Sequence, residues 1–204
     1  MDPHARHPSY PASFPDTHEL GEHDTLITTL EQSFARYPQR IAATCLDETL
    51  SYAQLARHSN NFAVYLHQSG LQRGDRVALM MPNSLPYLIA LAGVIQAGMV
   101  VVNVNPLYTP RELAHQLKDS GARSIVIAEP FLTTLEQVIE HTSVQQVLAT
   151  PVLGLLEQVD SEHASPFAKA LRDQVTAVPT EVAPTDIAFL QYTGGTTGVS
   201  KGAV

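Results

Sequence analysis

Hydrophobic and polar residues follow two different periods along the middle of the chain. Short unbroken apolar runs are typical of strands buried on both faces, whereas apolar residues spaced three or four apart are typical of helices. The two patterns take turns from residue 77 to residue 149. They predict strands at 77–81, 100–104, 124–128 and 146–149, and helices at 85–97, 110–120 and 131–141.

Strands that alternate with helices of this length predict a parallel sheet built from βαβ units. One helix start also has a local signal, because Thr109 is a candidate N-cap followed by Pro110 and, three residues on, by Glu112. Gly121 is a candidate stop for the same helix. The predicted fold class is therefore α/β, a three-layer sandwich with a mainly parallel sheet.

The chain divides into four predicted segments. They are a flexible N-terminal arm (1–23), an α/β subdomain (24–150), a connecting segment with a helix at 166–175 (151–185), and a strand at 187–190 with a glycine-rich loop (186–204). Within the α/β subdomain, a smaller group of elements precedes the βαβ units. It comprises a helix capped by Asp24 that ends before Pro38, strands at 41–46 and 49–51, and a helix from a Ser51–Gln54 capping box to Gly70.

Charge and composition exclude several classes of function. The net charge is −8, with 12 basic and 20 acidic residues and no Lys/Arg cluster, which argues against a nucleic-acid partner. The single cysteine, Cys45, excludes an internal disulfide and fits a reducing compartment. The histidines of the first 23 residues match no structural zinc spacing, and no metal-ligating residues are assigned. Since that arm also lacks the apolar core of a signal peptide, a cytoplasmic location is predicted.

Residues 85–104 have no charged side chain and are long enough to span a bilayer. However, Pro86, Gly93 and Gly98 interrupt the stretch. We interpret it as a buried helix followed by a buried strand. The loops after two predicted strands, Pro82-Asn83 and Asn105–Tyr108, would lie where parallel sheets bind ligands, although turn chemistry explains the same residues.

The span from Thr193 to Lys201 combines three glycines, three threonines, a serine and a lysine after an apolar strand. Glycines let backbone N–H groups approach an anion, while hydroxyls add donors and the lysine adds charge, so the span predicts a polyphosphate site. A flexible Gly/Thr linker is the simpler alternative. The P-loop of NTPases does not fit, because its Gly-Lys is followed by Ser or Thr, whereas Lys201 lies between Ser200 and Gly202.

The run Thr-Gly-Gly-Thr-Thr-Gly-Val-Ser-Lys-Gly at 193–202 resembles the ATP-phosphate loop of adenylate-forming enzymes, with Ser200 where many members have proline. Asn105–Thr109 together with Tyr192–Gly198 resembles bacterial long-chain fatty acid:CoA ligases in particular. The likeness extends over about residues 25–204. Its other landmarks are Ser51-Tyr52-x-x-Leu55, Gly74–Leu79, Pro82-Asn83, Ala97-Gly98 and His115–Ala122.

The resemblance implies ligation of a long-chain fatty acid to coenzyme A with ATP and Mg²⁺, through an acyl-adenylate. It implies peripheral contact with the inner membrane, and it leaves the oligomeric state open. By the same likeness, Lys201 and Thr196 are assigned catalytic roles, Lys201 offsetting charge on the departing pyrophosphate. The residues assigned to the ATP phosphates are Tyr192, Thr193, Gly194, Gly195, Thr196, Thr197, Gly198 and Lys201.

Family members also have a Mg²⁺-binding Glu, a ribose-binding Asp, a hinge and a C-terminal domain with a second lysine, all beyond the phosphate loop. We therefore expect residues 1–204 to be an N-terminal fragment that is inactive alone. Three alternatives remain: an aryl- or medium-chain acyl-CoA ligase, a non-catalytic α/β nucleotide-binding module, and a phosphate-hydrolysing NTPase.

Overall fold

The computed structural model describes residues 24–152, 154, 159, 161–172, 180–193 and 201–204. The helices are α1 (Leu26–Arg36), α2 (Tyr52–Gln68), α3 (Leu85–Gln96), α4 (Pro110–Ser120), α5 (Leu132–Glu136) and α6 (Phe167–Ala170), with 3₁₀ turns η1 (Glu129–Phe131) and η2 (Ile139–His141). The strands are β1 (Ile41–Cys45), β2 (Glu48–Ser51), β3 (Arg76–Met80), β4 (Val100–Asn103), β5 (Ser124–Ala128), β6 (Gln146–Thr150), β7 (Ser165–Pro166), β8 (Phe189–Thr193) and β9 (Lys201–Ala203).

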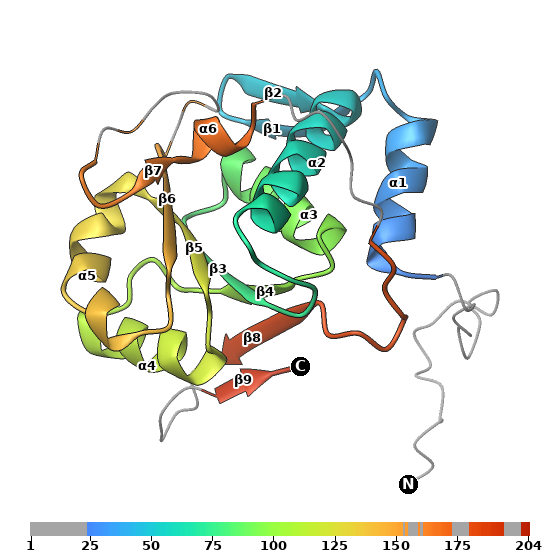
Figure 1. The fold of residues 1–204 in the computed structure, drawn as a ribbon. Helices are drawn as coiled ribbons and strands as arrows, with labels where there is room; N and C mark the ends of the chain where they lie inside the picture. Colours follow the sequence, from blue (N-terminus) through green and yellow to red (C-terminus); the bar gives the residue numbers. More distant parts are fainter. Residues whose placement is uncertain (1–23, 153, 155–158, 160, 173–179, 194–200) are drawn as a thin grey trace, which may run out of the picture.

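The predicted sandwich with a mainly parallel sheet is confirmed (Figure 1). The main sheet has the order β7-β6-β5-β3-β4-β8-β9, and every neighbouring pair in it is parallel except β8–β9. Strands β1 and β2 form a separate antiparallel pair. Because β4, β3, β5 and β6 are parallel neighbours joined by α3, α4 and α5, the βαβ repeat read from residues 77–149 is the centre of the fold.

The sheet separates two apolar layers. Successive residues of β3 face opposite sides, so Val77 and Leu79 pack in the layer of α2 and α3, while Ala78 and Met80 pack in the layer of α4 and α5. All four side chains are at most 1% exposed. Burial on both faces explains why these strands are continuous apolar runs in the sequence.

Several predicted helix ends are confirmed in atomic detail. Ser51 and Gln54 form the predicted capping box, with the Ser51 amide donating to Gln54 Oε1 at 2.8 Å. Thr109 caps α4, and the Glu112 carboxylate accepts from the Thr109 amide at 2.8 Å. Gly121 ends α4 with φ of 61°, in the left-handed region that glycine enters without steric cost. For α1, however, the N-cap is Thr25 rather than Asp24, because Thr25 forms a capping box with Thr28.

Two predicted helices are shorter than expected. The predicted helix 131–141 is divided into shorter pieces, since η1 ends at Phe131, α5 covers Leu132–Glu136 and η2 covers Ile139–His141. The helix predicted at 166–175 ends at Ala170, where the carbonyl of the next residue, Leu171, accepts from Asn61 Nδ2 at 3.0 Å. Residues 173–179 lie outside the described ranges. The strand predicted at 187–190 is observed as β8, which covers Phe189–Thr193 instead.

Residues 85–104 form α3 and β4, as interpreted from their glycines and proline. Within the described part of the chain, no helix combines the length and the apolar character that crossing a membrane requires.

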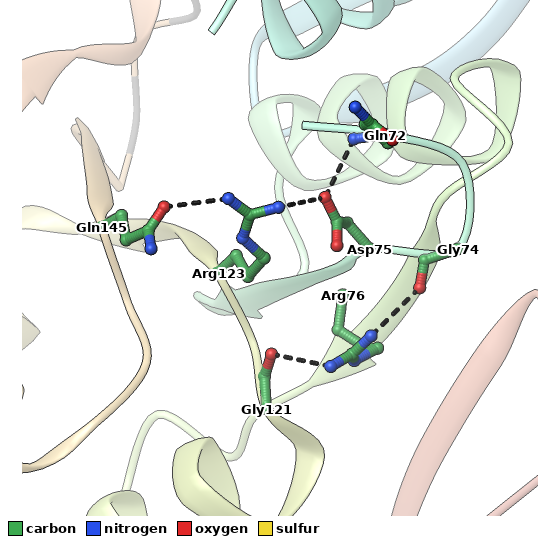
Figure 2. Close-up of polar contacts among 7 residues, drawn as sticks. All are labelled: Gln72, Gly74, Asp75, Arg76, Gly121, Arg123 and Gln145. Atoms are coloured by element: carbon green, nitrogen blue, oxygen red, sulfur yellow. Dashed lines mark hydrogen bonds and ion pairs between the residues drawn. The ribbon is translucent and has the colours of Figure 1, made fainter. Parts of the chain in front are cut away.

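Two arginines tie together the ends of strands β3, β5 and β6 at their amino edge (Figure 2). Arg123 donates to Asp75 Oδ2 at 2.8 Å and to Gln145 Oε1 at 3.1 Å. Arg76 donates to the carbonyl oxygens of Gly121 and Gly74, at 3.2 and 3.3 Å. These guanidinium groups therefore hold together the loops at the amino edge of the sheet.

Asp186 holds the segment that leads into β8, and its contribution to the stability of the fold depends on pH. Its carboxylate accepts from the Ala183 amide at 2.9 Å and pairs with Arg73. The backbone hydrogen bond and then the Arg73 hydrogen bond hold the pKa of Asp186 below its usual value. A carboxyl group with a lowered pKa in the folded state stabilises it above the unfolded pKa, and this stabilisation is lost as the pH falls.

We therefore expect Asp186→Asn to lower the melting temperature at pH 7, and the difference from the parent protein to shrink below about pH 4. Thermal melts of both proteins from pH 7 to pH 3 check this expectation. A difference that stays constant over that range would contradict it.

Candidate functional site

The two ends of the predicted phosphate loop meet in a hairpin. Strands β8 and β9 pair antiparallel, with Tyr192 opposite Gly202 and Thr193 opposite Lys201. Directly opposed residues in such a pair have Cβ atoms about 5 Å apart, on the same face of the sheet. The fold thus places Thr193 and Lys201 side by side, although seven residues separate them in the chain. The assigned residues between them, Gly194, Gly195, Thr196, Thr197 and Gly198, lie outside the described residues.

This hairpin lies at the carboxyl edge of the parallel sheet. Strand β8 runs parallel to β4, and Thr193 is its last residue (Figure 1). Ligands of open α/β sheets gather at this edge. Thr193 and Lys201 are both exposed. Since the two residues are directly opposite each other, the hydroxyl of Thr193 and the ammonium of Lys201 can reach the same anion.

Tyr192, by contrast, is only 8% exposed and points into the layer of α4. Its hydroxyl donates to Asp119 Oδ2 at 2.6 Å. Burial, then this hydrogen bond and the negative charge of Asp119, raise the pKa of Tyr192, so the phenol stays neutral and keeps its proton to donate. The structure thus gives Tyr192 a place beneath the hairpin, and its predicted contact with phosphate stays a prediction.

Gly202 is packed against the Tyr192 ring. A Cβ atom at Gly202 would lie 3.0 Å from Tyr192 Cζ, closer than ordinary van der Waals contact. The glycine at this position of the motif therefore lets β9 lie directly on the tyrosine.

The loop after β4 is another of the loops at the carboxyl edge, and its polar side chain Asn105 is hydrogen-bonded within the loop itself. Asn105 Oδ1 accepts from the Leu107 amide at 3.0 Å, which favours the turn interpretation for Asn105. Sequence reasoning missed Asn103 two residues earlier, whose side chain bonds to both α3 and β8. The signal was present, because Asn103 is a polar residue inside the apolar run 100–104.

Within the described ranges, no group of three or more His, Cys, Asp and Glu residues has the arrangement of a metal site. A cavity of about 450 Å³ lies among the start of α1, the end of α3 and residues 182–188. Because residues 182–188 precede β8, this cavity is at the other end of that strand from Lys201, and we do not assign it to the phosphate chemistry.

The chain matches a known protein family over most of its length. The family model described as "AMP-binding enzyme" matches residues 30–204. The long-chain-fatty-acid–CoA ligase of Escherichia coli O6:H1 (strain CFT073) is 45% identical, covering 96% of this chain and 39% of its own length. The ligase of the same name from Bacillus subtilis (strain 168) is 35% identical, covering 96% and 38%. The chain thus spans about two fifths of the length of these curated relatives.

Solved structures support the fold. A long-chain-fatty-acid-CoA ligase (FadD1) from Archaeoglobus fulgidus has a TM-score of 0.78 at 22% identity, covering 95% of this chain and 38% of its own. The apo structure of MbtA from Mycobacterium smegmatis has a TM-score of 0.75 at 28% identity, covering 89% and 33%.

Proposed function

The chain belongs to the AMP-binding enzyme family, and from this premise we propose that the protein ligates a long-chain fatty acid to coenzyme A. The observation that carries the proposal is the β8–β9 hairpin, which places Thr193 opposite Lys201 at the ends of the family's phosphate-loop motif. The identity of 45% with a long-chain-fatty-acid–CoA ligase supports the choice of substrate.

The proposed reaction has two steps. A carboxylate oxygen of the fatty acid first attacks the α-phosphorus of ATP, and the bond to pyrophosphate breaks, which leaves an acyl-adenylate. The thiol sulfur of coenzyme A then attacks the acyl carbon, AMP leaves, and the thiol proton is released. Catalysis of such transfers is largely positioning plus stabilisation of charge on oxygen atoms.

The described residues fit a polyphosphate. The exposed Lys201 ammonium offsets negative charge on the departing pyrophosphate, and the Thr193 hydroxyl beside it donates a hydrogen bond to a phosphate oxygen. Thr196 and the glycines of the motif are proposed to complete the contacts with the phosphates. Mg²⁺ is proposed to enter as the counter-ion of ATP and to neutralise phosphate charge when bound, with no described residue assigned to it.

The proposed fatty-acid substrate partitions into lipid, which supports peripheral contact with the inner membrane from the cytoplasmic side.

The test is pyrophosphate exchange by the protein in its full natural length. We expect exchange of labelled pyrophosphate into ATP to require palmitate, and addition of coenzyme A to yield the thioester and AMP. Octanoate and benzoate serve as comparison acids, because faster exchange with either would favour the medium-chain or aryl alternative. Hydrolysis of ATP to ADP and phosphate without any acid-dependent exchange would overturn the proposal and favour an NTPase.

A further inference from the structure

Polar side chains hold the end of β8 from the side of α3. Asn103 lies directly opposite Gln191 across the β4–β8 pair, and its Nδ2 donates to Gln191 Oε1 at 3.0 Å. On the other side of the amide, Asn103 Oδ1 accepts from the hydroxyl of Tyr87 at 3.0 Å. Tyr87 belongs to α3, so this chain of two hydrogen bonds joins a buried helix to the strand that leads into the hairpin.

A second set of bonds holds the same region from the side of α4. Asp119, in the last turn of α4, accepts from the Tyr192 hydroxyl at 2.6 Å. Gln116, one turn earlier and fully buried, donates from Nε2 to the Asn103 carbonyl at 2.7 Å. The other polar atom of this side chain, Oε1, has no hydrogen-bond partner among the described residues. The bond to the Asn103 carbonyl is therefore the interaction that orients Gln116.

The hairpin depends on these side chains because its backbone support is limited. The β4–β8 ladder ends at the Asn103–Gln191 pair, and beyond it Thr193 pairs only with β9. Strand β9 has three residues and is the outermost of the described strands on this side of the sheet. Short edge strands are the first parts of a sheet to open. Among the described residues, Gln191 and Tyr192 are therefore the points nearest to Thr193 at which side chains from other elements hold the hairpin.

We propose that Asn103 and Asp119 are positioning residues that hold β8 from opposite faces of the sheet and so fix Thr193 and Lys201 for the phosphates of ATP. The proposal rests on the proposed function for its ligand. Neither residue touches the phosphates in this role: each acts through a residue of β8, Asn103 through Gln191 and Asp119 through Tyr192.

Three variants of the full natural-length protein test the role. Asp119→Ala removes the acceptor of the Tyr192 hydroxyl, whereas Asp119→Asn keeps an oxygen acceptor and removes only the charge. Tyr87→Phe removes the hydroxyl that holds Asn103 and keeps the ring. The matched control is Tyr65→Phe, which also removes one hydrogen bond, from Gln146 Nε2 to the Tyr65 hydroxyl at 3.2 Å, but at the amino end of β6.

We expect Asp119→Ala and Tyr87→Phe to raise the KM for ATP about fivefold, the effect of losing one partly buried hydrogen bond, with the KM for coenzyme A and the melting temperature little changed. Asp119→Asn should restore the KM, and Tyr65→Phe should leave it at the parent value. An Asp119→Asn variant as impaired as Asp119→Ala would overturn the positioning role, because the charge rather than the bond would then matter.

Hydrogen–deuterium exchange without ATP provides a second measurement that does not require catalysis. We expect faster exchange in the backbone amides of 189–193 and 201–203 for Asp119→Ala and Tyr87→Phe than for Tyr65→Phe. Unchanged exchange there would overturn the proposal even if the enzyme is active. Faster exchange with an unchanged KM for ATP would overturn its link to ATP. Absence of any acid-dependent ATP turnover in the parent protein would instead overturn the proposed function.

Discussion

Replacing Phe62 with alanine is expected to lower the free energy of unfolding by about 3–5 kcal/mol, the cost of emptying a large core position. Phe62 is 0% exposed, in the middle of α2. Its ring meets the ring of Phe167 edge-on, with centroids 4.9 Å apart and planes at 85°. On the α3 side, a Cβ atom at Gly93 would lie only 2.7 Å from Phe62 Cδ1, so the helix backbone itself packs on the ring. Removing the ring therefore leaves a space that three elements line.

Urea denaturation followed by far-UV circular dichroism measures this effect. Leu107→Ala is the control, because Leu107 is 82% exposed and its loss should change stability by less than about 0.5 kcal/mol. If the two variants unfold at the same urea concentration, the assignment of Phe62 to the centre of the α2–α3 layer is contradicted.

Replacing Lys201 with alanine is expected to slow adenylation of the fatty acid at least tenfold in the protein of full natural length. A charge-assisted hydrogen bond contributes about 1.5–3 kcal/mol, and each 1.4 kcal/mol, roughly, corresponds to a factor of ten in rate. Lys201 is exposed and opposite Thr193, so its ammonium can reach a bound anion without leaving a buried partner unpaired. Pyrophosphate exchange at saturating ATP and palmitate measures the change.

Lys169→Ala provides the matched control for charge. Lys169 is also an exposed lysine, but it lies on α6, away from the hairpin in the fold (Figure 1). We expect its removal to leave the exchange rate unchanged. A Lys201→Ala variant with the parent exchange rate would contradict the assigned role on pyrophosphate.

The parts of the fold that could be predicted are those whose signals are local. The capping boxes at Ser51 and Thr109 and the left-handed Gly121 depend on residues within one turn of each other, and all three are present as predicted. The apolar runs at 100–104 and 124–128 predicted strands buried on both faces, and β4 and β5 lie in the middle of the sheet. The predicted N-cap of α1, Asp24, was wrong, because its neighbour Thr25 caps the helix through a capping box with Thr28.

In the candidate site too, local sequence predicted one part and not the other. A polyphosphate site could be predicted at Thr193–Lys201, because glycines, hydroxyls and a lysine are adjacent in the chain, and the resemblance to adenylate-forming enzymes assigned it to ATP. The support beneath it could not, since Tyr87, Asn103 and Gln191 are joined over sequence separations of 16 and 88 residues. No periodic pattern indicates which polar side chains will meet across a sheet.

The sequence by itself determined the alternation of strands and helices from residue 77 to residue 149 and the helix caps at Ser51 and Thr109, because each depends on neighbours in the chain. For the same reason it predicted phosphate chemistry for the Thr193–Lys201 motif. Only the tertiary structure decided that Thr193 and Lys201 oppose each other in a β8–β9 hairpin, that Ser165–Pro166 adds β7 to the sheet, and that Tyr192 is turned inward to Asp119. These features depend on contacts between distant segments, and such contacts become favourable only when the apolar core has brought the segments together.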